Sequence, residues 1–284
     1  MDLGLAGTKA IVTGGSKGIG RETARILAEE GCDVAITARD GDRLELVAKE
    51  ISQATGRTVV PLTGDMSVQA DVERTMAAAI DALGHVDVLV TCAGSSPGGL
   101  LEDLTEADWM SSVGLKFMGY VRCCSVILPH MRERGSGSVV LVVGNDGLKS
   151  SYWELTAGIA NAADINFVSA VAEQYGRHGV RINTVNPGPV NTDRWDGLEK
   201  RFALDRNLPQ AEARRIVLGT LPLGRICEPE EVASVVAFLA SPRASYVSGT
   251  HVLTDGAQMK GLLDAGLSRV GAPAIDLPRR QGTR

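Results

Sequence analysis

The chain has 284 residues, of which 44% are hydrophobic, 22% are charged and 4% are aromatic. This length and apolar content suit one domain of ordinary enzyme size, or at most two, with a large hydrophobic core. The net charge of −5 argues against a nucleic-acid-binding surface, which needs clustered Lys and Arg.

The cysteines and histidines show no metal-ligand or disulfide pattern. The five cysteines are odd in number, lack CxxC spacing and lie mostly in apolar runs, so we expect buried thiols in a reducing compartment. No apolar segment approaches the roughly 18 residues of a membrane span, and the N-terminus lacks a basic region followed by an apolar one. We therefore expect a soluble, cytoplasmic protein that binds no metal, membrane or nucleic acid.

The first predicted element is a buried strand that ends in a glycine-rich loop. Ala10 to Val12 form the apolar run, and residues 13–20 read Thr-Gly-Gly-Ser-Lys-Gly-Ile-Gly. Glycines can take positive φ and let the main chain approach a pyrophosphate, and the helix that follows places its N–H groups under the phosphates. Such a loop alone is a weak signal, but here it opens a βαβ unit of about thirty residues, the size that a dinucleotide fold requires.

Apolar strand-like runs recur between helical patterns along the rest of the chain. Their alternation with helices predicts an α/β fold, a single doubly wound Rossmann domain with a seven-stranded parallel sheet. The seven runs are 9–13, 33–38, 58–62, 86–91, 138–143, 180–185 and 250–254.

Together these features resemble the short-chain dehydrogenase/reductase family, whose phosphate loop reads T-G-x-x-x-G-x-G. The resemblance spans about residues 5–258 and implies a catalytic domain over 1–258, with a substrate lid at 192–221. It also implies a homo-oligomer, either a dimer or a tetramer. We expect the tail, residues 259–284, to be disordered or packed on a neighbouring subunit. The further matching segments are 64–67, 87–94, 186–192, 222–225, 229–233 and 255–256.

The resemblance also implies a nicotinamide cofactor. Arg39 ends the second strand, where an acidic residue would bind the adenosine ribose hydroxyls, and with Ser16 and Lys17 it suits a 2′-phosphate. We therefore expect NADP(H), although Lys17 and Arg39 are alternatively surface cations. The cofactor-binding residues that the resemblance assigns are Gly14, Ser16, Lys17, Gly18, Ile19, Gly20, Arg39, Asp65, Met66, Ala93, Gly94, Asn161, Pro187, Gly188, Val190 and Thr192.

The proton-transfer residues of the family are replaced in this chain. The family uses a Ser, an Asn and a Tyr-x-x-x-Lys pair, but no Tyr-x-x-x-Lys occurs between residues 140 and 175. Counting from neighbouring motifs puts Gly144 at the Ser position and Ala157 at the Tyr position. The same count puts Asn161 at the Lys position and Lys116 at the Asn position.

Two of these changes read as an exchange between helices. Lys116 can bring an ammonium to the nicotinamide pocket from the other helix, while Asn161 keeps a ribose hydrogen bond through its amide. Alternatively, Lys116 points to solvent and the site has decayed. A Lys in an otherwise apolar helix is costly unless it is paired or used. Tyr152 lies near the expected pocket and can act as acid or base, although a Tyr beside a Trp more often forms a packing wall.

Three functions follow from this sequence. The first is an NADP(H)-dependent oxidoreductase that acts on a small or medium organic carbonyl, alcohol or imine, with Lys116, Asn161 and Tyr152 as its catalytic residues. The second is a redox-silent lyase, isomerase, hydratase or cyclase on the same scaffold, because fold alone does not fix chemistry. The third is a non-enzymatic cofactor-binding subunit. We rank them in this order.

Overall fold

A seven-stranded parallel sheet forms the centre of the molecule in the computed structural model, which describes residues 2–258. The strand order is β3-β2-β1-β4-β5-β6-β7, and every pair of neighbours is parallel. This confirms the predicted doubly wound Rossmann fold; the predicted tail lies outside the described residues. The strands are β1 (Lys9–Thr13), β2 (Asp33–Ala38), β3 (Val59–Thr63), β4 (Val88–Thr91), β5 (Gly137–Val142), β6 (Val180–Pro187) and β7 (His251–Thr254).

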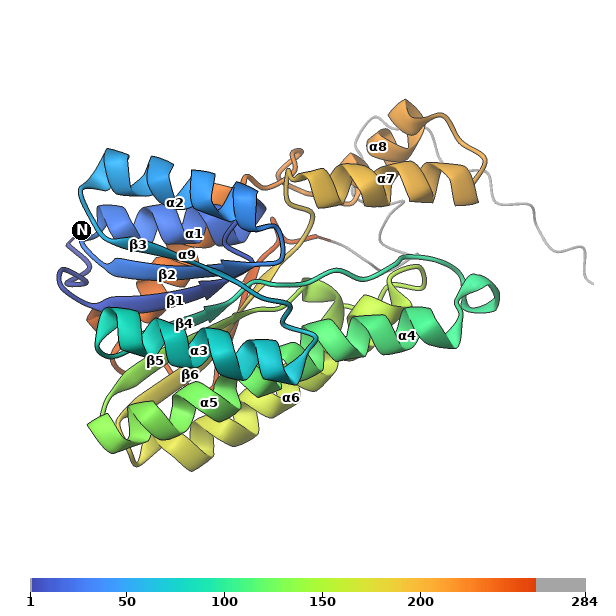
Figure 1. Ribbon diagram of the computed structural model, residues 1–284. Coiled ribbons are helices and arrows are strands. Elements are labelled where there is room, and N and C mark those ends of the chain that lie inside the picture. Colours follow the sequence, from blue (N-terminus) through green and yellow to red (C-terminus); the bar gives the residue numbers. More distant parts are fainter. Residues whose placement is uncertain (1, 259–284) are drawn as a thin grey trace, which may run out of the picture.

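Helices cover both faces of the sheet (Figure 1). Buried residues of α1, α2 and α9 pack on one face, and those of α3, α5 and α6 pack on the other. The α-helices are α1 (Gly18–Glu29), α2 (Gly41–Thr55), α3 (Gln69–Leu83), α4 (Glu106–Ser112), α5 (Met118–Arg134), α6 (Leu155–Gly176), α7 (Asp193–Asp205), α8 (Gln210–Gly219) and α9 (Pro229–Ala240). Shorter helical turns are η1 (Leu101–Asp103), η2 (Val113–Phe117), η3 (Asn145–Gly147) and η4 (Pro242–Ala244).

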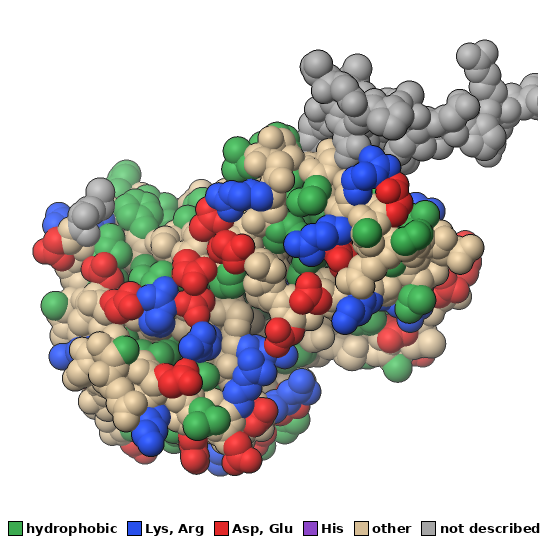
Figure 2. All heavy atoms as spheres, turned by 90° about the horizontal axis from the view of Figure 1, so that it is seen from above, with side chains coloured by type: hydrophobic (Ala, Val, Ile, Leu, Met, Phe, Trp, Pro, Cys, Tyr) green, Lys and Arg blue, Asp and Glu red, His purple; other side chains and the backbone are tan. Residues whose placement is uncertain are grey.

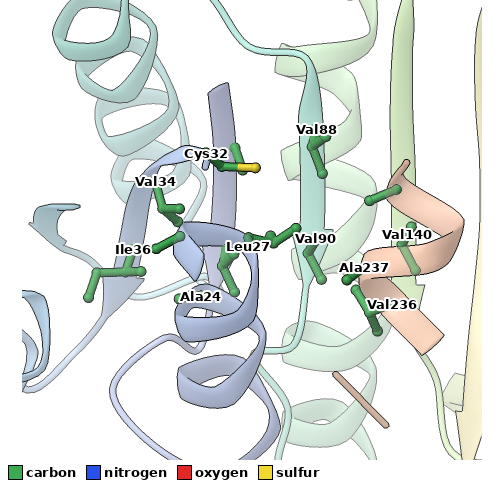
Figure 3. Close-up of a cluster of buried hydrophobic side chains, with 14 of the residues drawn as sticks. Ala24, Leu27, Cys32, Val34, Ile36, Val88, Val90, Val140, Val236 and Ala237 are labelled. Carbon is green, nitrogen blue, oxygen red and sulfur yellow. The ribbon is translucent and has the colours of Figure 1, made fainter. Parts of the chain in front are cut away.

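The alternation of side chains along each strand divides the core into two clusters. Ile11 and Leu89 face the α3/α5/α6 side, whereas Val12 and Val90 face the α1/α2/α9 side. Figure 3 shows part of the second cluster, in which Leu27 of α1 and Val236 of α9 meet the strands. A fully buried aliphatic side chain of this kind contributes about 1.5–3 kcal/mol. Helices therefore cover the apolar side chains on both faces of the sheet, and we expect polar functional groups at the ends of the strands.

Helix α6 is the one described helix that is long and apolar enough to cross a membrane by length and composition, with a mean hydropathy of 1.2. Its inner face packs on β6 and η2. The apolar composition therefore does not require a membrane. On its outer side Ile159 is 55% exposed.

Helices α7 and α8 occupy the segment for which we predict a lid, here called the lid, and lie beyond the carboxyl ends of the strands (Figure 1). Glu199 of α7 is buried and accepts hydrogen bonds from Gln210 at 3.1 Å and Arg214 at 3.5 Å, which joins the two helices. The lid is also tied to the rest of the chain, because Trp153 Nε1 donates to Asp205 at 2.9 Å. Figure 2 shows acidic and basic side chains interspersed on the face seen from above, so that face carries no patch of one sign.

Candidate active site

The glycine-rich loop lies where the strand order reverses, between β1 and β4, and this is where doubly wound sheets bind their ligands. A β-carbon on Gly14 would lie 2.9 Å from the backbone nitrogen of Ala93, and one on Gly20 would lie 2.3 Å from the carbonyl oxygen of Gly14. Gly14 and Gly18 also have positive φ, at 71° and 54°. Glycine is therefore required at these positions for the main chain to take this path.

The start of α1 offers N–H groups to an anion. Lys17 is the N-cap residue, but no side chain caps this 12-residue helix. An uncapped helix N-terminus combines free N–H donors with a favourable dipole and suits a phosphate. Thr192 lies beside this loop, with its Cγ2 3.2 Å from the β-carbon position of Gly18. The segment after β6 therefore reaches the loop as the resemblance predicted.

Arg39 follows β2 with its side chain 73% exposed, and its Nη1 lies 3.9 Å from Asp65 Oδ2. The guanidinium is therefore free to bind a further anion. Apart from Asn161, which lies in α6, the other predicted cofactor residues also lie in or after the carboxyl ends of parallel strands, although their roles stay predictions. These residues are Ser16 and Ile19 after β1; Asp65 and Met66 after β3; Ala93 and Gly94 after β4; and Pro187, Gly188 and Val190 at and after the end of β6.

Thr13 ties the two central strands together at this edge. Its Oγ1 accepts hydrogen bonds from the N–H groups of Cys92 at 3.1 Å and Ala93 at 3.2 Å. The β4 segment is thus held against the glycine-rich loop, although Thr91 and Cys92 replace the family's asparagines.

Lys116 points into the molecule and not to solvent. It is 3% exposed and lies in η2, a π-helical turn of the kind often found at functional sites. A β-carbon on Gly94 would lie 3.4 Å from Lys116 Cγ and 3.5 Å from its Cε, so the lysine chain runs beneath the segment that follows β4. Burial, and next the positive charge of Arg194, lower the pKa of Lys116 to about 8.

Asn161 binds a carboxylate that the sequence did not predict. It is fully buried in α6, and its Nδ2 donates to Asp146 Oδ1 at 2.6 Å. Asp146 lies in η3, the turn after β5, and is 7% exposed. A β-carbon on Gly144 would lie 2.3 Å from this Asp146 oxygen and 2.6 Å from the Asn161 nitrogen. The absence of a side chain at Gly144 therefore makes the Asp146–Asn161 contact possible.

Asp164 is a second carboxylate that the sequence analysis missed. It lies one turn after Asn161 on α6, is fully buried, and neither of its oxygens has a hydrogen-bond partner among the described residues. Burial raises the pKa of Asp164 to about 8, against a smaller opposing effect of Lys116. An acidic residue within the apolar run of α6 was the available signal, because it carries the same penalty that drew attention to Lys116.

Tyr152 is not among the groups brought together. Its side chain is 49% exposed, and its hydroxyl accepts a hydrogen bond from Arg206, whose guanidinium carbon lies 5.2 Å from the centre of the tyrosine ring. This contact joins the lid to the loop before α6. The roles that the sequence analysis considered for Tyr152, acid or base and packing wall, stay predictions.

The described residues contain no group of three or more His, Cys, Asp or Glu side chains that could hold a metal ion. Buried ionisable groups lie around Asn161, on the side of the sheet that carries the glycine-rich loop. A cationic side chain, two carboxylates and an amide are present there, but the hydroxyls that the family would place at 144 and 157 are missing.

Comparison with known proteins gives matches over almost the whole described chain. The family described as enoyl-(acyl carrier protein) reductase matches residues 14–257. A subunit of a hydroxy(phenyl)methylsuccinyl-CoA dehydrogenase from Thauera aromatica is 30% identical over 247 residues, covering 87% of this chain and 94% of its own. The 3-oxoacyl-acyl-carrier-protein reductase of Chlamydia trachomatis is 31% identical over 252 residues, covering 89% and 97%.

Solved structures agree with these sequence matches. L-sorbose reductase from Gluconobacter frateurii, in complex with NADPH and L-sorbose, superimposes with a TM-score of 0.85 at 28% identity, covering 92% of this chain and 100% of the reductase. The fold, the glycine-rich loop and these relatives lead to one assignment. The chain belongs to the short-chain dehydrogenase/reductase family of oxidoreductases.

Proposed function

We propose that this protein is an NADP(H)-dependent oxidoreductase that acts on a small or medium organic carbonyl, alcohol or imine. The observation that carries the proposal is the phosphate cradle. Gly14 and Gly20 admit no side chain, and the N-terminus of α1 has no side-chain cap. A dinucleotide would account for both features, because it needs close backbone approach and free N–H donors.

Arg39 carries the choice of NADP(H) over NAD(H). Its side chain is 73% exposed at the end of β2, with Asp65 as a distant partner. A guanidinium binds a phosphate through paired, charge-assisted hydrogen bonds. The L-sorbose reductase structure, which contains NADPH, gives the proposal a precedent within the fold.

In the proposed function, separate groups of this chain would bind the cofactor and stabilise the reacting oxygen. The glycine-rich loop and the start of α1 would hold the pyrophosphate, and Arg39 would hold the 2′-phosphate. The bound cofactor supplies or accepts hydride. Lys116, buried beneath Gly94, would stabilise negative charge on the reacting oxygen, because an ammonium acts strongly in a site that excludes water.

We also propose a cytoplasmic homo-oligomer, a dimer or a tetramer, with α5 and α6 at its main interface. The outer side of α6 supports this, because Ile159 is 55% exposed on an apolar helix. Sedimentation or light scattering of the purified protein tests the oligomeric state.

The function is tested with NADPH that carries deuterium at the transferable hydride position. The purified protein is incubated with carbonyls, imines and a host-cell extract, and the products are searched by mass spectrometry. Deuterium in a product supports hydride transfer. Substrate that is consumed without deuterium, while NADPH stays intact, contradicts it.

One observation favours the second candidate, a redox-silent lyase, isomerase, hydratase or cyclase. The positions that hold hydroxyl donors in the family are Gly144 and Ala157 here, while Lys116 and Asp146 provide an acid and a base without them. Conversion without deuterium would support this reading. No conversion, together with a change in activity when an active relative is mixed in, would instead support a non-enzymatic partner subunit.

A further inference from the structure

Asp146 Oδ2 and Asn161 Oδ1 are buried hydrogen-bond acceptors, and neither has a partner among the described residues. A buried polar atom left without a partner destabilises the folded protein. The two residues are joined by a hydrogen bond, so their unpaired acceptors belong to one cluster, which indicates a site that binds a donor.

Asp146 is held in a defined orientation within this cluster. Its Oδ1 accepts the 2.6 Å hydrogen bond from Asn161, which fixes the amide with its nitrogen toward the carboxylate and its own oxygen away. Its Oδ2 lies 3.9 Å from the β-carbon position of Gly158, in the first turns of α6. That oxygen therefore lies beside the turn of α6 that contains residue 157, the position at which relatives carry the tyrosine.

Gly144 makes room for this carboxylate. Any side chain at 144 would place its β-carbon 2.3 Å from Asp146 Oδ1. An acceptor thus occupies the space in which the family has a serine hydroxyl, a group that can donate. Gly144 thus leaves the space in which Asp146 and Asn161 form their hydrogen bond.

The neighbouring donors are not positioned to satisfy these acceptors. The hydroxyl of Tyr120 donates to the carbonyl oxygen of Val142 at 3.0 Å. Lys116 makes no hydrogen bond or ion pair within the described residues, although it interacts electrostatically with both Asp146 and Asp164. Lys116 also faces Arg194 of α7 and Glu154 just before α6, so its charge is influenced by groups from several elements.

We propose that Asp146 is the proton acceptor of the reaction and that the substrate is an alcohol or an amine. This rests on the function proposed above. In the step, the C–H bond of the reacting carbon breaks, and its hydride leaves for the oxidised dinucleotide. The O–H or N–H bond breaks as well, its proton goes to Asp146 Oδ2, and its electron pair completes the C=O or C=N bond. The proton then passes to water.

The kinetic test compares isosteric variants with NADP⁺ and a panel of secondary alcohols and primary amines over pH 6–10. Asp146→Asn removes the proton acceptor, and we expect kcat to fall by about 10²- to 10⁴-fold. The matched control is Asp81→Asn, which changes an exposed carboxylate of α3 and leaves kcat unchanged. Oxidation at wild-type rates in Asp146→Asn would overturn the inference and leave the proposed function standing.

A second variant tests the arrangement itself. Gly144→Ala places a methyl group where Asp146 Oδ1 lies, so we expect it to reproduce the loss seen in Asp146→Asn. Gly176→Ala is the matched control, because no atom lies within 4 Å of the added methyl group. Wild-type turnover in Gly144→Ala would show that the position of Asp146 is unimportant and would contradict the proposal.

Binding without turnover separates this inference from the proposed function. Ligand-observed NMR compares cyclohexanol, cyclohexylamine and cyclohexanone on the full chain without dinucleotide. We expect the wild type to prefer the two donors over the ketone by about tenfold, which corresponds to one hydrogen bond. Asp146→Asn should lose this preference, and an unchanged preference or a wild type that favours the ketone would overturn the assignment. If Asp146 governs donor binding but no alcohol or amine reduces NADP⁺, the proposed function fails and the oxidation step fails with it.

Discussion

The side chain of Lys116 is 3% exposed and lies beneath Gly94. The sequence left open whether this ammonium serves the site or points to solvent, and its burial excludes the solvent-facing alternative. We expect Lys116→Met, which keeps the packing of the aliphatic chain, to lower kcat by roughly 10²-fold or more, since a preorganised charge is lost. Tyr152→Phe should leave kcat nearly unchanged, because that hydroxyl contacts Arg206 at the lid. Steady-state kinetics on both variants check this, and equal effects would contradict the role of Lys116.

The predicted preference for NADP(H) over NAD(H) depends on Arg39. Arg39→Ala should weaken NADPH binding by about 10- to 100-fold and leave NADH binding nearly unchanged, because a charge-assisted contact is worth about 1.5–3 kcal/mol. Fluorescence titration with each dinucleotide measures the two dissociation constants. Arg132→Ala, at an exposed position of α5, is the control. An unchanged ratio of the two constants would contradict the choice of NADP(H).

At the scale of elements, Trp153 ties the lid to the loop before α6, together with the contact between Tyr152 and Arg206. Trp153 is 6% exposed, donates to Asp205 of α7 and meets the ring of Phe202 edge-on at 5.5 Å. Trp153→Ala should release α7 and α8 locally, because few other side chains tie the lid down. Hydrogen exchange should accelerate in residues 193–219 while the strands stay protected. Tyr246→Ala, at a fully exposed ring, is the control, and equal protection of the lid in both variants would contradict this account.

Elements that depend on local signals were predictable from sequence, and contacts between distant elements were not. The seven strands and the glycine-rich loop were correct because period, apolarity and glycine spacing are local signals. The Asp146–Asn161 contact was missed. It depends on how η3 folds beside Gly144 and brings Asp146 to Asn161 of α6, fifteen residues later in the chain. The environment of Tyr152 was likewise set by Arg206, fifty-four residues away. Local patterns thus predicted the glycine-rich loop, whereas long-range packing set the environments of Asp146, Asn161 and Tyr152.

At the scale of the whole molecule, Asp164 should make the free energy of unfolding depend on pH in an unusual direction. Burial raises its pKa from 3.8 to about 8, so between these values the folded chain binds a proton that the unfolded chain has released. Stability from this group is therefore fully present below about pH 4 and is lost as the pH rises through about 8. Lys116 acts in a higher window, because its pKa falls from 10.5 to about 8, and stability from that group returns above pH 8.

Asp164→Asn isolates this effect, because the amide keeps the shape of the side chain without a titrating proton. At each pH, the unfolding free energy of the variant is subtracted from that of the wild type. The subtraction cancels the contributions of ordinary paired carboxylates such as Asp255, whose pKa is lowered by contacts with Lys149 and Asn145. The wild type should lose about 1–3 kcal/mol relative to the variant between pH 5 and pH 8, less than the full shift implies, because Lys116 offsets part of the penalty. Urea unfolding measured across that range provides the comparison. Parallel curves of unfolding free energy against pH for the two proteins would mean that Asp164 ionises freely in the folded chain. Burial of this charge would then have no effect on stability.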